Sequence, residues 1–284
     1  MIVVTGATGV LNGATVEQLL KRVPPNEIGI SVRNTNRAQH FADRGVRVRQ
    51  GSYEDPATLR ESFAGAEQVL LVSGNDPTAD MMTLHRNAIE AAAAAGAQRI
   101  LYTSQSGATD SPYPPAQLHA ATESLLADSG VAWTALRYGF FGSLDDLLGP
   151  WQQTGSIAKP ADGPIPWVDR ADLAEAAAVI LAGDRSFDGP VTLTPSRAVT
   201  LDDFARAAST VTGRTIERVV VDDDQWVAEQ TASGMPEPVA RFDLSMFQAT
   251  RTGYYAQTDP LLTELLGREP RDIDDLLADQ VSEA

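Results

Sequence analysis

The chain has 284 residues, of which 43% are hydrophobic and 21% charged, a balance that indicates a folded protein and excludes a disordered one. Its formal net charge of -16 at pH 7 excludes nucleic acid and anionic membrane surfaces as partners, because their phosphates would repel it. Cysteine is absent, which excludes disulfides, thiolate nucleophiles and thiol redox couples.

Neither a membrane span nor a leader is expected. No apolar run approaches the roughly 20 residues that a membrane-spanning helix needs. The first buried strand is expected to start at Ile2, which leaves no room for a leader ahead of it. We therefore expect a cytoplasmic protein.

Short β-branched strands alternate with helical segments up to about residue 140. The expected strands are 2–4, 28–32, 46–48, 69–72, 99–103 and 131–136, and the expected helices are 11–22, 36–43, 57–63, 78–95 and 116–129. Strands this apolar are buried on both faces, which predicts a parallel sheet covered by helices on each side. The fold class is thus α/β, a Rossmann-like doubly wound parallel sheet with a smaller C-terminal α/β substrate domain.

The alternation stops after about residue 140. Residues 149–166 are rich in Pro and Gly and are expected to form an irregular loop. Asp169 and Thr200 can each cap a following helix. The remaining expected elements are a short strand at 219–221 and several short helices over 223–280. We expect a NAD(P)-binding Rossmann domain over 1–140, to which elements near 168–195 return, and a smaller substrate-binding part over 141–284.

The segment TGATGVLNG, residues 5–13, lies between the first strand and the first helix, where a parallel sheet binds the pyrophosphate of a dinucleotide. Gly6 and Gly9 allow the backbone to approach it closely. Asn12 stands where such loops have their third glycine, which lets the helix pack near the strand. Either its amide finds a partner, in a phosphate or a nearby loop, or Gly13 supplies the close contact instead.

Arg33 follows the second strand. An acidic residue at this place would bind the ribose 2′-hydroxyl of NAD, whereas a guanidinium suits the 2′-phosphate of NADP. We expect NADPH as the cofactor, held by Arg33 with help from Arg37, while NAD stays possible. The alternative is that Arg33 stacks over the adenine, which is compatible with either cofactor.

Several motifs together identify a family resemblance. They are TGATGxxxG at the start, VRN at 32–34, QGSYED at 50–55, HRN at 85–87, LYTS at 101–104, LRxG at 136–139 and RAD at 170–172. The chain resembles the NmrA-like branch of atypical short-chain dehydrogenases, and within it the bacterial type-2 NAD(P)H:quinone oxidoreductases. This resemblance implies a Rossmann domain, NADPH and a small C-terminal domain that closes over a quinone.

The resemblance also assigns cofactor contacts. The implied set is Gly6, Thr8, Gly9, Val10, Leu11 and Asn12 at the pyrophosphate, Arg33 and Asn34 at the 2′-phosphate, Ser52 and Tyr53 near adenine, Ser73 and Gly74 near the ribose, and Thr103 and Ser104 near the nicotinamide. Three residues depart from the pattern: Asn12, Tyr138 in place of Asn, and Ser124 in place of a basic residue.

The chemistry of the pocket follows from a missing acid. Typical members of the wider family use Tyr-x-x-x-Lys to protonate the alkoxide formed from a ketone, whereas this chain has His119-x-x-x-Glu123 and no lysine there. A quinone gives a delocalised, weakly basic anion, so a missing acid fits such an acceptor. His119, the best proton donor available, and Tyr138 are the catalytic candidates, and the alternative for His119 is a structural role. His40 and His85 are expected to be structural or exposed.

Aromatic side chains gather where the cleft is expected. The candidate substrate platform is Tyr113, Tyr138, Phe140, Phe141, Trp151 and Trp167, and a lid could come from Phe247, Tyr254 and Tyr255. Flat side chains can sandwich a planar ring, but core packing explains each of them equally well.

Three functions remain open. The first is hydride transfer from NADPH to a quinone or quinone-like aromatic, with no flavin and no metal. The second is a tailoring enzyme of aromatic polyketide biosynthesis, either a reductase or a cofactor-dependent monooxygenase. The third is a non-catalytic NADP-binding redox sensor with a protein partner. The chain is expected to be a monomer or a homodimer.

Overall fold

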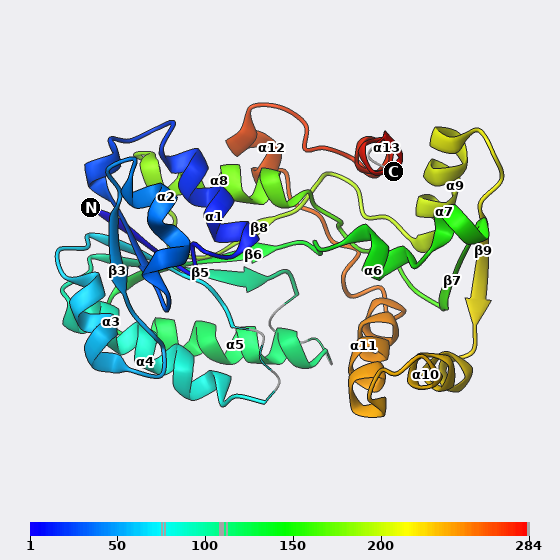
Figure 1. The fold of residues 1–284 in the computed structure, drawn as a ribbon, viewed down its shortest axis with the longest axis horizontal. Coiled ribbons are helices and arrows are strands. Elements are labelled where there is room, and N and C mark those ends of the chain that lie inside the picture. The colour runs from blue at the N-terminus through cyan, green and yellow to red at the C-terminus, as the bar shows by residue number, and fades with distance from the viewer. Residues whose placement is uncertain (75, 77, 108–110, 112, 283–284) are drawn as a thin grey trace.

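The described part of the chain forms a seven-stranded parallel sheet flanked by helices, with a second group of elements beyond one end of it (Figure 1). The computed structural model describes residues 1–74, 76, 78–107, 111 and 113–282. The strands, in sheet order, are β3 (Arg47–Gln50), β2 (Ile28–Val32), β1 (Ile2–Thr5), β4 (Gln68–Leu71), β5 (Arg99–Gln105), β6 (Ala132–Tyr138) and β8 (Gly189–Leu193). All neighbouring pairs are parallel, so the strands end at one common edge, which we call the carboxyl edge.

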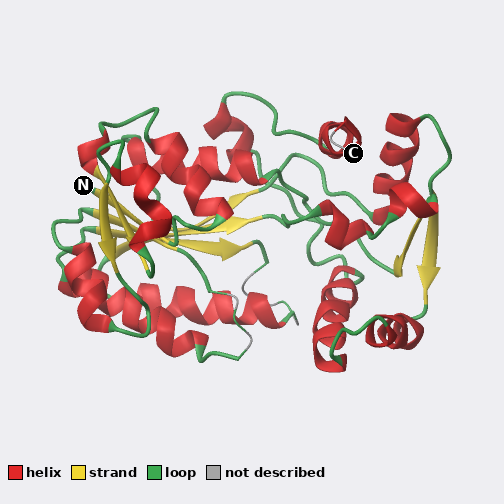
Figure 2. Cartoon of the chain, viewed as in Figure 1, coloured by secondary structure: helices red, strands yellow, loops and turns green. Residues whose placement is uncertain are grey.

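Helices cover both faces of the sheet (Figure 2). One face, here called the α8 face, packs on α1 (Val10–Leu19), α2 (Gln39–Ala42), α8 (Arg170–Ala182) and α12 (Leu261–Leu266). The other, the α5 face, packs on α3 (Pro56–Phe63), α4 (Met81–Ala94) and α5 (Pro114–Ala127). Buried strands between two helical layers confirm the predicted doubly wound α/β fold.

The second group of elements has its own hydrophobic core, which we call the second core. It is built from α6 (Leu144–Leu148), α7 (Trp151–Thr154), β7 (Ser156–Pro160), α9 (Leu201–Thr212), β9 (Glu217–Val221), α10 (Asp223–Ala232), α11 (Glu237–Thr250) and α13 (Ile273–Ser282). Strands β7 and β9 pair in parallel as a separate two-stranded sheet. In Figure 1, α11 stands beyond the N-terminal end of α5, across from the carboxyl edge.

Both predicted helix caps are confirmed. The Asp169 side chain accepts a hydrogen bond from the backbone N–H of Ala171 at the start of α8. Thr200 and Asp203 form a capping box at the start of α9, each side chain accepting from the backbone of the other. The helix expected over 36–43 is instead a 3-10 turn, Thr35–Ala38, followed by the single turn of α2.

The prediction of an irregular loop over 149–166 was wrong. This segment contains the short helix α7 and the strand β7. Gly149 and Gly155 have φ of 71° and 72°, so they reverse the chain on either side of α7. Pro150 precedes the first turn of α7, where its missing N–H costs no hydrogen bond. Here Gly and Pro separate short elements rather than fill a loop.

Candidate active site

The glycine loop between β1 and α1 has the geometry that a pyrophosphate needs. Gly6 has a φ of 65°, and a Cβ atom there would lie 2.6 Å from Cγ1 of Val72, so only glycine fits. Gly9 caps α1 without a side-chain hydrogen bond, and the first turn carries no acidic residue. The N-terminal N–H groups and the positive end of the helix dipole therefore remain available to an anion. Thr8 lies in the turn, and Val10, at the helix start, is 70% exposed.

Asn12 is turned away from that anion position. Its side chain is 1% exposed, and its amide nitrogen donates a 2.8 Å hydrogen bond to the carbonyl of Thr5 at the end of β1. A Cβ atom at Gly13 would lie 3.0 Å from the carbonyl oxygen of Ala7. Both alternatives left open by the sequence thus hold: the amide has a partner in the nearby backbone, and Gly13 supplies a close contact. The Asn12 amide is bonded to β1 in this structure, and a contact from Asn12 to a phosphate stays a prediction.

Arg33 lies just past β2 at the carboxyl edge and is exposed. Among the described residues it makes no ion pair within 4 Å. Hydrogen bonds from Thr78, and more weakly the charge of Arg33, hold the pKa of Asp76 below its usual range, which places Asp76 near the guanidinium. Asn34 accepts a hydrogen bond from the N–H of Asn36 and so starts the following turn. Arg33 therefore presents an exposed guanidinium next to the glycine loop, with Asp76 nearby and no ion pair within 4 Å among the described residues.

The Tyr53 side chain links two strand ends at the carboxyl edge. Its hydroxyl lies 2.8 Å from Oγ1 of Thr5 and donates a 3.0 Å bond to the carbonyl of Val72, so it joins the ends of β1 and β4. Burial raises the pKa of Tyr53, which keeps the phenol protonated. Ser52 accepts a bond from the N–H of Glu54. The polar groups of both residues are in use, so an adenine contact would come from their apolar surfaces.

The residues expected near the ribose follow β4, and those expected near the nicotinamide lie beside them near the end of β5. The backbone N–H of Ser73 donates a 2.8 Å bond to Oγ1 of Thr103. The N–H of Gly74 donates to Nε2 of His85, whose Nδ1 lies 2.8 Å from Oγ1 of Thr122. Since Nε2 accepts, Nδ1 carries the proton of this ring. His85 is 2% exposed and orients the Gly74 loop, so its expected structural role is confirmed.

Ser104 is engaged on the α5 face. Its hydroxyl donates a 2.6 Å bond to the carboxylate of Glu123. Arg137 also binds this carboxylate, through Nε at 3.0 Å and an η nitrogen at 2.5 Å. The side chains of Glu123 and Arg137 are 7% and 17% exposed. This buried group ties α5 to β5 and β6, and it uses the donor of the Ser104 hydroxyl, so the oxygen can only accept a hydrogen bond from a ligand.

His119 lies on α5 with its Nδ1 2.9 Å from the hydroxyl of Tyr102. Burial, and to a lesser degree the nearby His85, lowers the pKa of His119 to about 3. The ring is therefore uncharged at neutral pH, and its role as a proton donor stays a prediction. A neutral ring can still donate a hydrogen bond from one nitrogen. Burial also raises the pKa of Tyr102, so its hydroxyl stays protonated.

Tyr138 ends β6 and points into the core of the α8 face. It is 1% exposed, and burial raises its pKa. Its hydroxyl has no hydrogen-bond partner among the described residues. Phe141 packs edge-on against its ring, with centroids 6.1 Å apart, and is itself 37% exposed. Of the two, Phe141 is the side chain that reaches the surface.

The expected aromatic platform divides into two sets. Tyr113 stacks on Phe140 with centroids 6.4 Å apart, and Tyr255 meets Phe140 edge-on at 5.0 Å. Trp151 and Trp167 are 1% and 7% exposed and belong to the second core, as does Phe140, which is 7% exposed. The platform residues thus differ in exposure, and their contact with a substrate stays a prediction.

The C-terminal aromatics partly match the expected lid. Tyr255 hydrogen bonds to Ser111 in the loop between β5 and α5. A Cβ atom at Gly107 of that loop would lie 2.7 Å from the Tyr254 ring and 2.8 Å from the Tyr255 ring. Both tyrosines therefore contact this loop at Gly107, while Tyr255 and Phe247 are both buried in the second core. Residues 108–110 and 112 of the loop lie outside the described residues.

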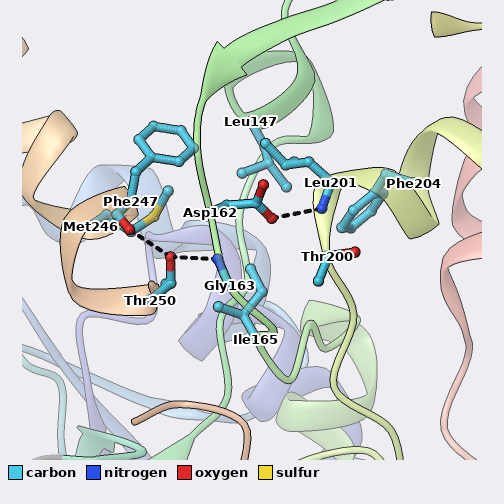
Figure 3. A pocket seen from close by; sticks show the side chains of 10 residues that line it. All are labelled: Leu147, Asp162, Gly163, Ile165, Thr200, Leu201, Phe204, Met246, Phe247 and Thr250. Atoms are coloured by element: carbon cyan, nitrogen blue, oxygen red, sulfur yellow. Dashed lines mark hydrogen bonds between the residues drawn. The ribbon is translucent and has the colours of Figure 1, made fainter. Parts of the chain in front are cut away.

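A small cavity lies inside the second core, and Phe247 is among the residues that line it (Figure 3). It has a volume of about 10 Å³ and is lined in part by Leu147, Ile165 and Phe204. At its rim Asp162 accepts a hydrogen bond from the N–H of Leu201, and the N–H of Gly163 donates to Thr250. This space suits one water molecule and excludes a substrate.

Two absences are limited to the described part of the chain. No group of three or more His, Cys, Asp or Glu side chains there is placed to hold a metal ion. No helix there has the length and apolar character that crossing a bilayer requires.

Some contributors to the site were not singled out from the sequence. Tyr102, Arg137 and Asp76 reach it through partners far along the chain. Tyr102 and Arg137 fall within the LYTS and LRxG motifs, which are the signals that could have indicated them. No pattern in the sequence indicates Asp76.

Comparisons with known proteins agree with this geometry. The NAD(P)H-binding family model matches residues 6–184. Quinone oxidoreductase 2 of Escherichia coli (strain K12) is 35% identical over 243 residues, 84% of this chain and 84% of that protein. The NmrA-like family domain-containing oxidoreductase flvB of Aspergillus flavus is 29% identical over 277 residues, 94% of this chain and 90% of that protein. The structure of the Citrobacter sp. triphenylmethane reductase complexed with NADP(H) superposes with a TM-score of 0.91 at 32% identity, covering 99% of each chain. The chain therefore belongs to the NAD(P)H-binding, NmrA-like family of oxidoreductases.

Proposed function

We propose that this protein transfers hydride from NADPH to a quinone or a quinone-like aromatic, without flavin or metal. One observation carries the proposal. The described residues near the expected nicotinamide position include no positively charged histidine or lysine that could donate a proton at neutral pH. His119 is neutral, and α5 contains no lysine. An acceptor that stabilises its own anion fits this site, whereas a simple ketone, whose alkoxide needs a positioned acid, does not.

The cofactor fits the residues present. The glycine loop leaves room for a pyrophosphate at the uncapped N-terminus of α1, and Arg33 offers an exposed guanidinium for the 2′-phosphate. Bound there, NADPH supplies the hydride. The chain holds it across the carboxyl edge, and the partly exposed side chains of Tyr113 and Phe141 provide flat surfaces against which a planar acceptor can lie.

His119 takes a polarising role in this proposal. The hydroxyl of Tyr102 lies 2.9 Å from Nδ1 of His119, and we assign the phenol as the donor, which leaves the proton of the imidazole on Nε2. A neutral Nε2–H can hydrogen bond to an acceptor oxygen as negative charge develops on it. Water then supplies the proton that a hydroquinone product requires.

Because the site lacks a positioned proton donor, it also favours a second class of hydride acceptor. A delocalised carbocation becomes neutral when it accepts hydride, so it needs no proton at all. The similar Citrobacter enzyme is named as a triphenylmethane reductase. The net charge of -16 also favours approach of a cationic aromatic.

The proposal includes the arrangement expected from the sequence: a cofactor-binding domain over 1–140 with elements returning near 168–195, and a substrate-binding part over 141–284. It also includes a cytoplasmic location and a monomeric or dimeric state. The second core supports a separate C-terminal unit, because its buried residues all lie between 140 and 277.

A substrate panel tests the function. NADPH oxidation is followed with the purified, flavin-free protein and with a one-ring quinone, a multi-ring quinone, a cationic triphenylmethane dye and an aromatic ketone. We expect turnover with the quinones and none with the ketone. Preference for the multi-ring quinone would favour a polyketide-tailoring role, and oxygen consumption in proportion to substrate would indicate a monooxygenase. Tight NADP binding without turnover of any acceptor would contradict the proposal and favour a sensor.

A further inference from the structure

Three unpartnered polar atoms gather where β5 and β6 end at the carboxyl edge. They are Oε1 of Gln105, Oγ of Ser106 and the hydroxyl of Tyr138, each buried and without a hydrogen bond among the described residues. Gln105 and Tyr138 are register partners across the two strands, and the N–H of Ser106 donates a 2.7 Å bond to the carbonyl of Tyr138. Buried polar atoms are nearly always paired in native proteins, so such a group indicates a missing partner.

Strand alternation places two of these groups on one face. Leu101 and Leu136 belong to the core of the α8 face, as does Tyr138. Gln105 lies four residues after Leu101 along β5, and side chains two and four residues apart in a strand share a face. The amide of Gln105 and the phenol of Tyr138 therefore stand next to each other on the α8 face, which is also the face that carries α1.

The strand order indicates which part of a dinucleotide would reach them. Arg33 follows β2 and the glycine loop follows β1, so the 2′-phosphate and the pyrophosphate occupy that side of the carboxyl edge. The rest of the cofactor then extends over β4 toward β5 and β6. Neighbouring strands lie about 4.8 Å apart, so the gap between β5 and β6 is about 12 Å from β1. That separation suits the nicotinamide end of an extended cofactor.

We propose that Gln105, Ser106 and Tyr138 form the recognition site for the nicotinamide carboxamide. A primary carboxamide has a carbonyl that accepts and an NH₂ group that donates. The Tyr138 hydroxyl donates to the carbonyl, Oε1 of Gln105 accepts from the NH₂ group, and the Ser106 hydroxyl can serve either. Phe141 packs against the Tyr138 ring and is partly exposed. In this proposal the Phe141 side chain turns outward when the nicotinamide ring enters. This inference rests on the proposed function, because it assumes NADPH as the cofactor.

The first test separates binding of the carboxamide from binding of the rest of the cofactor. Calorimetry on the full chain compares the Kd values of NADP⁺ and 2′-phospho-ADP-ribose, which lacks the nicotinamide. We expect Tyr138→Phe to raise the Kd of NADP⁺ by about 2–10-fold, the equivalent of one hydrogen bond, and to leave the Kd of 2′-phospho-ADP-ribose unchanged. Equal changes for both ligands, or none for either, would overturn the inference.

The unliganded protein gives a second, independent readout. Removing a buried hydroxyl that has no partner removes only its desolvation penalty, so the Tm of Tyr138→Phe should equal or exceed that of the wild type. Tyr102→Phe is the matched control, because its hydroxyl bonds to His119, and its Tm should fall by roughly 2–4 °C. A lower Tm for Tyr138→Phe would show that the hydroxyl already has a partner, such as a buried water, and would count against a ligand role.

Gln105→Met extends the test to the other half of the carboxamide. The 3-acetylpyridine analogue of NADP⁺ keeps the carbonyl but replaces the NH₂ group by a methyl. The wild type should bind this analogue more weakly than NADP⁺, and Gln105→Met should lose that preference while Tyr138→Phe keeps it. Persistence of the preference in Gln105→Met would contradict the assignment. Failure of the wild type to bind either NADP⁺ or 2′-phospho-ADP-ribose would overturn the proposed function and this site with it.

Discussion

Glu123 and Arg137 form a two-point ion pair beneath the carboxyl edge, with Nε of Arg137 3.0 Å from one carboxylate oxygen and an η nitrogen 2.5 Å from the other. The hydroxyl of Ser104 adds a third hydrogen bond to the same carboxylate. Through this pair α5, which carries His119, is fixed to β5 and β6. The position of the site's histidine therefore depends on a buried charge cluster that itself does no chemistry.

Glu123→Gln should destabilise the fold strongly. The amide keeps the shape of the side chain but leaves the guanidinium of Arg137 largely buried without a counter-charge, which typically costs about 3–5 kcal/mol. The measurement is the free energy of urea unfolding. Glu17→Gln is the matched control, since Glu17 pairs with Arg44 at the surface and should lose less than about 1 kcal/mol. Similar decreases in the free energy of unfolding for the two variants would mean that the buried pair stabilises the fold no more than the surface pair does.

Arg33→Ala should lower kcat/KM for NADPH by roughly 10–100-fold, the equivalent of a charge-assisted hydrogen bond to phosphate, and leave kcat/KM for NADH nearly unchanged. The control is Arg44→Ala, which removes an exposed arginine that pairs with Glu17. An unchanged ratio between the two cofactors would refute the assignment of the 2′-phosphate and favour simple stacking on adenine.

Asn12→Gly restores the glycine usual at this place, yet it should destabilise the protein by about 1–2 kcal/mol. The variant loses the hydrogen bond to the Thr5 carbonyl and puts glycine inside a helix. The Kd of NADP⁺ should change by less than about twofold, because the Asn12 amide is bonded to β1. A large loss of affinity at unchanged stability would instead assign Asn12 to the phosphate.

Acid should destabilise the protein through His85. Burial lowers its pKa to about 4, whereas in the unfolded chain a histidine titrates near 6.5. As pH falls from about 6.5 to 4, the unfolded state takes up the proton first, so the free energy of unfolding decreases by about 3 kcal/mol across that window. Above pH 6.5 the full contribution of the neutral His85 ring to stability is retained. His85→Gln should flatten this part of the pH dependence. An identical slope in wild type and variant would contradict the buried neutral ring.

The fold and the cofactor loop could be predicted because their signals are local. The glycine pattern directly follows a buried strand, and Asp169 and Thr200 lie immediately before the helices that they cap. The burial of Trp151 could not be predicted in the same way, because whether an aromatic ring faces a cleft or a core depends on segments far along the chain. The same holds for Glu123 and Arg137, which meet only when α5 packs against β6.

The neutral state of His119 shows a different limit. The sequence identifies a histidine on the correct helix, but its pKa is set by burial and by His85, which is 34 positions away in the numbering. Asn12 shows a third limit: its departure from glycine was visible in the sequence, yet only the structure shows that its amide binds the end of β1.

The most direct test of the central claim is single-turnover oxidation of NADPH by the purified protein under anaerobic conditions, with no flavin and no added metal. With a quinone we predict one equivalent of NADPH oxidised for each quinone reduced, and a primary isotope effect when the transferred hydrogen is deuterium. Oxidation that requires added flavin, or proceeds equally well with an aromatic ketone, would contradict the account.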